Sequence, residues 1–283
     1  MKQINYHKIF LPAGILLLML IGLSCTEIVD IELNSADVRL VVDGSITTDS
    51  PTQIVKLTTT SDYFQNQPPP VVSGALVKIL DEDVEIIMVE TPSGSGIYKN
   101  QNDFYGVEDK TYRLEITLKE PVGGKIDYEA VTKMPVTRAS IDSIVLEYQQ
   151  LMKFWAVNLY ANDPLTTDFY KIDAMRNGVM ITDTATRSSI TDDLFFNGNN
   201  TNGLSVMFLY NDEVNPGDTL TFILSSIPKD YYDFFRELQL ESGASNPLFG
   251  GPPANISTNI QPEGLGFFTA QNRKRYTVIV KDE

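Results

Sequence analysis

The sequence predicts a mainly β protein with an N-terminal β-sandwich over residues 38–136 and a second β-rich domain, carrying one amphipathic helix, over residues 137–283. Three observations support this prediction. Short runs rich in β-branched and aromatic residues recur along the chain, and turn residues separate them at short intervals. Only one long stretch has the 3.6-residue apolar periodicity of a helix. Short strands at this spacing are typical of β-sandwiches, and the first domain has room for about seven of them.

Residues 1–24 have the layout of a bacterial lipoprotein signal peptide. Lys2 and Lys8 precede an apolar run over residues 10–23, and the small residue before Cys25 completes the pattern. The run is too short to cross a bilayer comfortably as a helix, which takes about 20 residues. We therefore expect Cys25 to be the lipid-bearing N-terminus of the mature protein. The alternatives are an anchor that stays uncleaved and a cysteine that lies at this position by chance.

The composition narrows the chemistry that the mature chain can perform. Cys25 is the sole cysteine, and the sole histidine, His7, lies inside the signal. Triads that use serine and histidine, cysteine–histidine dyads, histidine-based zinc sites and disulfides are therefore excluded. The net charge of −15 also disfavours a nucleic-acid partner. These features favour a non-enzymatic protein without a required cofactor.

Residues 25–37 are expected to form a short acidic and apolar tether that leads from the lipid to the first domain. The first two strands of that domain are expected to form an opening hairpin. The strands of the first domain are expected at residues 38–46, 53–58, 71–80, 84–90, 97–98, 111–118 and 126–134.

A proline-rich loop interrupts this strand pattern. Tyr63 and Phe64 precede Pro68, Pro69 and Pro70, and three successive prolines hold an extended conformation without backbone donors. Connecting loops run over protein surfaces and often carry binding residues. These five residues are therefore a candidate contact surface for a partner. The alternative is a plain connection between two strands.

The second domain has the same alternating pattern, with turn residues between its strands. A basic cluster at residues 271–275 is expected to be a hairpin turn, and the alternative is a docking patch for an acidic partner. The strands of the second domain are expected at residues 141–148, 154–160, 168–175, 204–210, 219–224, 265–268 and 276–280.

The one predicted helix lies near residues 228–241. Tyr231, Phe234, Phe235 and Leu238 are spaced at i, i+3, i+4 and i+7, so they form a stripe on one helix face. A single helix in a β-rich domain has to bury one face. We therefore expect the stripe to pack on the sheet rather than to bind a ligand.

An acidic loop in the second domain is a candidate calcium site. Asp192 and Asp193 precede an Asn- and Gly-rich stretch that contains Asn197 and Asn199. Calcium takes six to eight oxygen ligands from flexible loops, and carboxylates and amides supply them. The spacing is not that of an EF-hand. The alternative is an acidic turn that faces water.

Several stretches together resemble one protein family. They are residues 40–46, 60–64 leading into 68–70, 72–75, 193–198, 231–235, 246–249 and 259–268. In order and spacing they are similar to the Bacteroidota lipoproteins catalogued as domain of unknown function 4249. The resemblance implies an outer-membrane lipoprotein whose first domain is an immunoglobulin-like or prealbumin-like sandwich. It also implies a companion of a TonB-dependent receptor, and it defines no catalytic residues.

The leading hypothesis is a non-enzymatic lipoprotein of the cell envelope, lipid-anchored to the outer membrane through Cys25 on its periplasmic or its surface face. It would bind a ligand or a TonB-dependent receptor. One alternative is a glycan hydrolase, because two carboxylates on either side of a sugar can hydrolyse glycosides without histidine. A second alternative is a structural or assembly lipoprotein without a soluble ligand.

Three short triplets resemble the O-glycosylation acceptor of Bacteroidota envelope proteins. Each consists of an aspartate, a hydroxyl residue and an apolar residue, and the candidate acceptors are Ser143, Thr184 and Thr219. Thr219 follows a Gly-Asp turn, which favours exposure. We expect it to be the preferred acceptor of the three.

Overall fold

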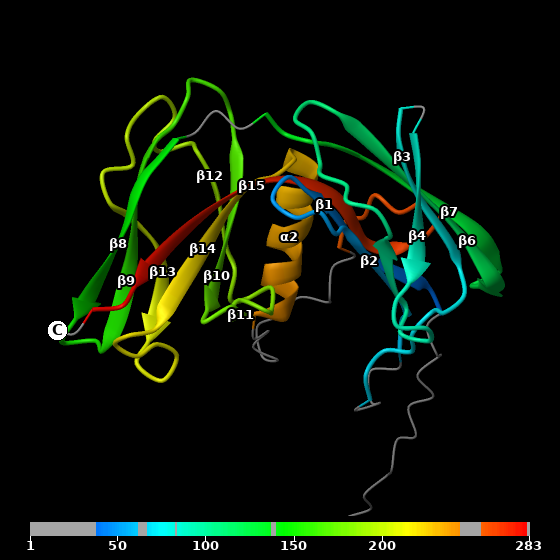
Figure 1. Ribbon diagram of the computed structural model, residues 1–283, viewed down its shortest axis with the longest axis horizontal. Helices are drawn as coiled ribbons and strands as arrows, with labels where there is room; N and C mark the ends of the chain where they lie inside the picture. Colours follow the sequence, from blue (N-terminus) through cyan, green and yellow to red (C-terminus); the bar gives the residue numbers. More distant parts are fainter. Residues whose placement is uncertain (1–37, 62–66, 83, 137–139, 244–255, 282–283) are drawn as a thin grey trace, which may run out of the picture. The chain divides into compact units, whose positions relative to one another are not determined.

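The computed structural model describes residues 38–61, 67–82, 84–136, 140–243 and 256–281 (Figure 1). All of them belong to one compact unit, Asp37–Glu283. Strands dominate this unit, which confirms the predicted fold class. Within the described ranges, no helix is long and apolar enough to span a lipid bilayer. Cys25, the expected site of lipidation, and the tether expected at residues 25–37 lie outside the described residues.

The first half of the unit contains the seven strands that the sequence analysis expects. They are β1 (Leu40–Thr47), β2 (Ile54–Thr59), β3 (Leu76–Asp81), β4 (Val84–Glu90), β5 (Ile97–Asn100), β6 (Thr111–Val122) and β7 (Lys125–Lys133). They are hydrogen-bonded in the order β1-β2-β5-β4-β3-β6-β7. Alternate residues of β1, β2, β3 and β6 are buried, because successive side chains of a strand point to opposite faces. One core therefore lies on the inner face of this sheet.

The second half of the unit supplies the remaining strands and the helix. They are β8 (Ser140–Gln149), β9 (Phe154–Asn162), β10 (Phe169–Arg176), β11 (Val179–Met180), β12 (Ser189–Asp192), β13 (Leu204–Tyr210), β14 (Thr219–Ser226), α2 (Lys229–Ser242) and β15 (Leu265–Ile279). A three-stranded sheet, β13-β9-β8, packs through Trp155 and Val157 on Ile172 and Phe222 of β10 and β14. This face-to-face packing forms a second core.

Strand β15 joins the two halves into one sheet of twelve strands. Its first residues pair in parallel with β1, from Leu265 to Gln271, and its later residues pair antiparallel with β14, from Asn272 to Ile279. Figure 1 shows β15 in red between blue β1 and yellow β14. A single strand therefore takes part in both halves of the fold.

The packing of β15 changes how the chain is divided. Ile260, Phe268 and Ala270 are fully buried in the first core, although the sequence analysis placed all of residues 137–283 in the second domain. Gln261 also pairs with Glu129 of β7, the edge strand of the first sheet, so this segment contacts both ends of that sheet. By its packing, the segment from Ile260 to Ala270 thus belongs with the first core.

The hairpin turn expected at residues 271–275 is wrong, because these residues lie inside β15. Gln271 pairs with β1, and Asn272, Arg273 and Arg275 continue the ladder with β14. The cluster contains no glycine or proline to turn the chain. Its charges instead lie along a strand, where Arg275 forms an ion pair with Asp49 at 2.6 Å.

The helix expected near residues 228–241 is confirmed as α2. It begins after Pro228, and Gly243 ends it by donating its backbone N–H to the carbonyl of Gln239 at 2.8 Å. The rings of Tyr231 and Phe234 lie 5.4 and 5.0 Å from the ring of Phe267 in β15. The aromatic stripe packs on the sheet, as expected, but the same residues also line a cavity.

Candidate functional site

A cavity of about 680 Å³ lies between α2 and the sheet. Its floor comes from β1, β10 and β15, one wall comes from α2, and residues after β11 form part of the rim. The residues that line the cavity include Asp43, Lys171, Thr184, Ser188, Tyr231, Phe234, Phe235, Phe267, Thr269, Gln271 and Arg273. We refer to it as the α2 cavity.

The floor of the α2 cavity follows from the alternation of the strands. In β15 the even-numbered Phe268 and Ala270 enter the first core, so the odd-numbered Phe267, Thr269 and Gln271 face the cavity. Strand β1 is paired in register with this segment and presents its own odd-numbered side chains to the same face. The same strands therefore build both a core and a cavity floor.

Lys171, which lines the α2 cavity, forms a buried ion pair with Asp173. Lys171 of β10 donates to Oδ1 of Asp173 at 2.5 Å, and its ammonium lies 5.2 Å above the ring of Phe235. Asp173 also accepts hydrogen bonds from the hydroxyls of Ser188 at 2.7 Å and Thr182 at 3.1 Å. Burial lowers the pKa of Lys171, and the charge of Asp173 opposes this shift. The pair is satisfied within the protein.

Asp43 differs from this pair because its carboxylate has no partner within the described residues. The Asp43 side chain is exposed to solvent and lies among the residues that line the cavity. Loss of water raises the pKa of the Asp43 carboxyl, and the charges of Lys56 and Lys171 lower it by less. An exposed carboxylate without an ion-pair partner among the described residues therefore lines the cavity.

Arg273 supplies a cation to the same cavity. Its guanidinium donates twice to Oε1 of Gln271, at 3.0 and 2.6 Å. Asp49 is the carboxylate with the largest influence on Arg273, but it forms its ion pair with Arg275 instead. Burial lowers the pKa of Arg273, and among the described carboxylates none forms an ion pair with it. The guanidinium can therefore receive an anionic group.

The α2 cavity also contains an unsatisfied hydroxyl. Thr269 is 2% exposed, and its Oγ1 has no hydrogen-bond partner within the described part of the chain. The Tyr231 hydroxyl differs, because it has a hydrogen bond with the Gln271 side chain; burial raises the pKa of Tyr231, and this hydrogen bond opposes the shift. Buried polar groups are normally hydrogen-bonded. The cavity thus offers polar groups that a ligand can satisfy.

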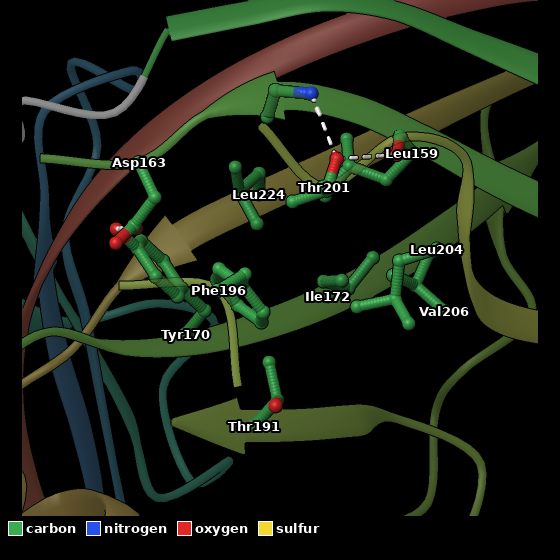
Figure 2. Close-up of a pocket in the computed structure, with 11 residues that line it drawn as sticks. Leu159, Asp163, Tyr170, Ile172, Thr191, Phe196, Thr201, Leu204, Val206 and Leu224 are labelled. Carbon is green, nitrogen blue, oxygen red and sulfur yellow. Dashed lines mark hydrogen bonds between the residues drawn. The ribbon is translucent and has the colours of Figure 1, made fainter. Parts of the chain in front are cut away.

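A second, much smaller pocket lies in the second core (Figure 2). It holds about 20 Å³, and apolar side chains such as Leu159, Ile172 and Leu224 line most of it. Space of this size accommodates about one water molecule. The pocket is a packing defect rather than a ligand site.

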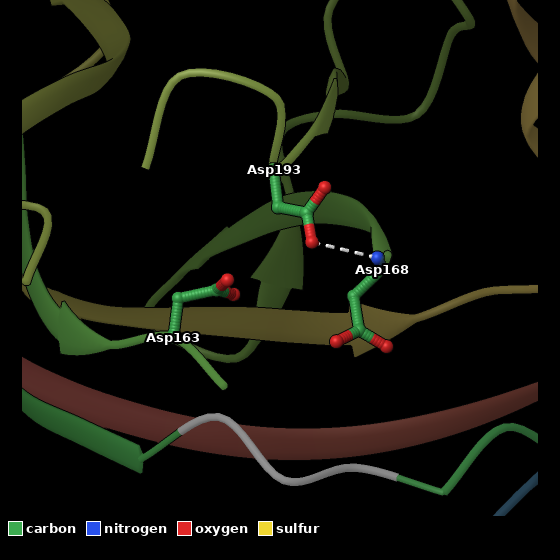
Figure 3. Close-up of side chains that lie close together, drawn as sticks. All are labelled: Asp163, Asp168 and Asp193. Carbon is green, nitrogen blue, oxygen red and sulfur yellow. Dashed lines mark hydrogen bonds between the residues drawn. The ribbon is translucent and has the colours of Figure 1, made fainter. Parts of the chain in front are cut away.

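Of the four residues expected to bind calcium, Asp192, Asp193, Asn197 and Asn199, only Asp193 belongs to the group of neighbouring carboxylates in the described part of the chain. Asp193 lies close to Asp163 and Asp168, and these three side chains form one group, whereas Asp192 is not part of it (Figure 3). Burial and the neighbouring charges of Asp193 and Asp168 raise the pKa of Asp163, although the Tyr170 hydroxyl opposes this.

Other predicted site residues lie apart from the cavity. Pro68, Pro69 and Pro70 are exposed, whereas Tyr63 and Phe64 lie outside the described residues. Of the three candidate O-glycosylation residues, Ser143 is half-buried, and Thr184 and Thr219 are exposed. Thr184 lies at the rim of the α2 cavity. Exposure is compatible with modification, which stays a prediction.

The charged residues of the α2 cavity were missed because they alternate with apolar ones. Lys171 and Asp173 alternate with Tyr170 and Ile172, a pattern that indicates a face turned to solvent. That face is instead covered by α2, which contacts β10 and β15. The sequence signal that could have revealed this face is the apolar stripe of α2, because a helix with such a stripe needs a sheet face to pack on.

Comparison with known proteins identifies the family of the chain. The family model described as domain of unknown function 4249 matches residues 26–277. The chain belongs to this family. No curated protein matches this chain.

Among solved structures, the 4249-family chain is similar to the three N-terminal domains of the Highly Immunogenic Outer Capsid protein of bacteriophage RB49. The two are 9% identical, with 87% of this chain and 71% of the phage chain covered. The TM-score is 0.22, which is too low to indicate a shared fold.

Proposed function

We propose that the protein is a non-enzymatic binding protein of the bacterial cell envelope, and that its ligand occupies the α2 cavity. The observation that carries this proposal is the pair of charged groups, Asp43 and Arg273, that face the cavity without ion-pair partners among the described residues. The Arg273 guanidinium is half-buried, and a partly desolvated charge costs stability unless it is paired. Proteins keep such groups mainly where function requires them.

The size and lining of the cavity fit a small-molecule site. Such sites typically measure about 300–1,000 Å³ and combine an apolar wall with a few polar groups. The volume here is about 680 Å³, and Phe234, Phe235 and Phe267 supply the aromatic wall. We infer that the ligand is amphipathic, with an anionic group for Arg273, an apolar body against the rings and a donor for Asp43. A planar guanidinium suits carboxylate, sulfonate or phosphate groups.

The proposal is tested with 1-anilinonaphthalene-8-sulfonate, a fluorescent dye with an anionic group on an aromatic body. We expect one dye molecule to bind per protein, and we expect Arg273→Gln to weaken binding at least tenfold, because a charge-assisted contact is worth about 1.5–3 kcal/mol. Fluorescence titration measures both quantities. Thermal unfolding of each variant shows whether it is folded.

Arg113→Gln is the matched control, because Arg113 pairs with Glu129 on an exposed strand surface and does not line the cavity. The control should bind the dye as the wild type does. Equal affinities of the wild type and a folded Arg273→Gln variant would contradict the proposal.

The proposed envelope location rests on the signal layout before Cys25. We propose that lipid on Cys25 anchors the protein to the outer membrane and that a TonB-dependent receptor is its partner. In the native cell, Cys25→Ser should move the protein from the membrane pellet to the soluble fraction, measured by fractionation and immunoblotting. An unchanged distribution would refute the anchor. The receptor proposal fails if no receptor co-purifies with the lipidated protein from solubilised outer membranes.

A carboxylate-based glycan hydrolase is the second candidate, favoured by the raised pKa of Asp43 in a cavity. A hydrolase also needs a second carboxylate that is free to react. The nearby Asp173 is held by Lys171, Ser188 and Thr182, which favours binding over catalysis. The hydrolase candidate requires release of p-nitrophenol from aryl glycosides by the wild type and its loss in Asp43→Asn.

A further inference from the structure

Three aspartates from different parts of the second half meet at one edge of the fold (Figure 3). Asp163 follows the end of β9, Asp168 precedes β10, and Asp193 follows β12. Strands β10 and β12 pair antiparallel, with Phe169 opposite Asp192, so the start of one lies beside the end of the other. The turn from β9 into β10 brings Asp163 to the same place.

The spacing of the three carboxylates fits a single cation. One oxygen from each lies within 4.8 Å of the other two. Calcium binds oxygen at about 2.3–2.6 Å, so oxygens on opposite sides of the ion are about 5 Å apart. One calcium ion can therefore contact all three carboxylates. Zinc and other soft metals are disfavoured because the cluster has no nitrogen or sulfur ligand.

A separate observation concerns the hydrogen bonds of Asp163. Asp163 is 8% exposed, and its Oδ1 accepts the hydroxyl hydrogen of Tyr170 at 2.8 Å. Its Oδ2 is buried and has no hydrogen-bond partner within the described residues. Figure 3 shows this carboxylate directed toward Asp193. A buried carboxylate oxygen without a partner is costly, and a bound cation would satisfy it.

The protein does not neutralise the cluster itself. Asp193 is 1% exposed and accepts the backbone N–H of Asp168 at 2.8 Å, and Asp168 accepts the hydroxyl of Thr166 at 2.6 Å. Across the described ranges, no lysine or arginine forms an ion pair with any of the three aspartates. Three carboxylates at this distance repel one another strongly unless a cation lies between them.

We propose that Asp163, Asp168 and Asp193 bind one Ca²⁺ ion. The site keeps Asp193 from the sequence prediction and replaces the other predicted ligands by Asp163 and Asp168. Because β9 belongs to the three-stranded sheet and β10 to the large sheet, the ion fastens the two sheets of the second core at one edge. Water and backbone oxygens can complete the coordination that calcium prefers.

The experiment uses the full chain, first freed of metal with EDTA and then titrated with CaCl₂ by calorimetry and by thermal unfolding. We expect one Ca²⁺ per protein and a Tm that rises with calcium concentration, because a ligand that binds only the folded state stabilises it. Asp163→Asn and Asp168→Asn should each weaken calcium binding at least tenfold. Asp168 is half-buried, so its variant keeps the test valid if Asp163→Asn fails to fold.

Asp192→Asn is the matched control, because Asp192 is adjacent in sequence to Asp193 but lies outside the cluster. This variant should bind calcium as the wild type does. No binding heat and no change in Tm up to about 10 mM calcium, above the range of extracellular calcium modules, would overturn the proposal. Equal affinities of the wild type and the Asp163→Asn or Asp168→Asn variant would also overturn it, as would tighter binding of Mg²⁺ than of Ca²⁺.

Discussion

Gly266→Ala should prevent the protein from folding. Gly266 stands at the start of β15, opposite Val42 of β1, with a φ of +82°. A Cβ atom at this position would lie 2.0 Å from the carbonyl oxygen of Val42, and backbone atoms cannot yield as a flexible side chain can. The substitution therefore breaks the parallel pairing that joins the two halves. Soluble yield, circular dichroism and thermal unfolding measure the effect.

Gly124→Ala is the control that separates backbone strain from the steric clash. Gly124 lies in the turn between β6 and β7 with a φ of +77°, and a Cβ there would meet nothing within 4 Å. Gly124→Ala should lower the free energy of unfolding only by the strain of a left-handed residue, about 1–2 kcal/mol, and the protein should stay folded. If the two variants lose the same stability, the close approach of β15 to β1 is not what requires a glycine at position 266.

Lys171→Met should destabilise the protein by about 3–5 kcal/mol, because removal of one partner leaves a buried charge without compensation. Asp173 is 4% exposed and would keep only the hydroxyls of Ser188 and Thr182. Denaturant unfolding at neutral pH measures the change in the free energy of unfolding. The double variant Lys171→Met with Asp173→Leu should recover most of the loss, because it leaves no unpaired charge.

Lys229→Met provides the comparison at an exposed pair. Lys229 and Asp233 are spaced i, i+4 on α2, and the lysine side chain is 67% exposed. Such pairs contribute about 0.3–0.5 kcal/mol, so this variant should unfold nearly as the wild type does. If Lys171→Met lowers the free energy of unfolding as little as Lys229→Met does, the removal of Lys171 does not leave a buried, uncompensated charge on Asp173.

Local patterns predicted most of the strands and the helix, but they did not predict β11 and β12, and they divided β15 into two strands. Its ends, residues 265–268 and 276–280, have clear strand character, whereas the basic residues between them indicate a turn. The segment is extended because it pairs with β1, which lies more than 200 residues earlier in the chain. A pattern read over a short stretch of sequence does not contain information about a pairing partner that is this far away in the chain. The same fact explains why Phe268 packs in the first core.

The candidate sites were predicted less well than the strands. Asp193 was expected to bind a metal because it precedes an Asn-rich loop, but its partners Asp163 and Asp168 flank an ordinary turn. They meet Asp193 only because β10 pairs with β12. Asp43 is an exposed residue of a strand, and it lines a cavity because α2 and the residues after β11 lie near the same face of the sheet. Both sites depend on contacts that a linear pattern does not contain.

A crystal structure of the protein with bound 1-anilinonaphthalene-8-sulfonate tests most directly whether the α2 cavity is the binding site. We expect the dye's rings to lie against Phe234 and Phe267, and its sulfonate to accept hydrogen bonds from the Arg273 guanidinium at about 2.7–2.9 Å. Density for the dye only outside the cavity, or a sulfonate directed away from Arg273, would contradict the proposed binding function.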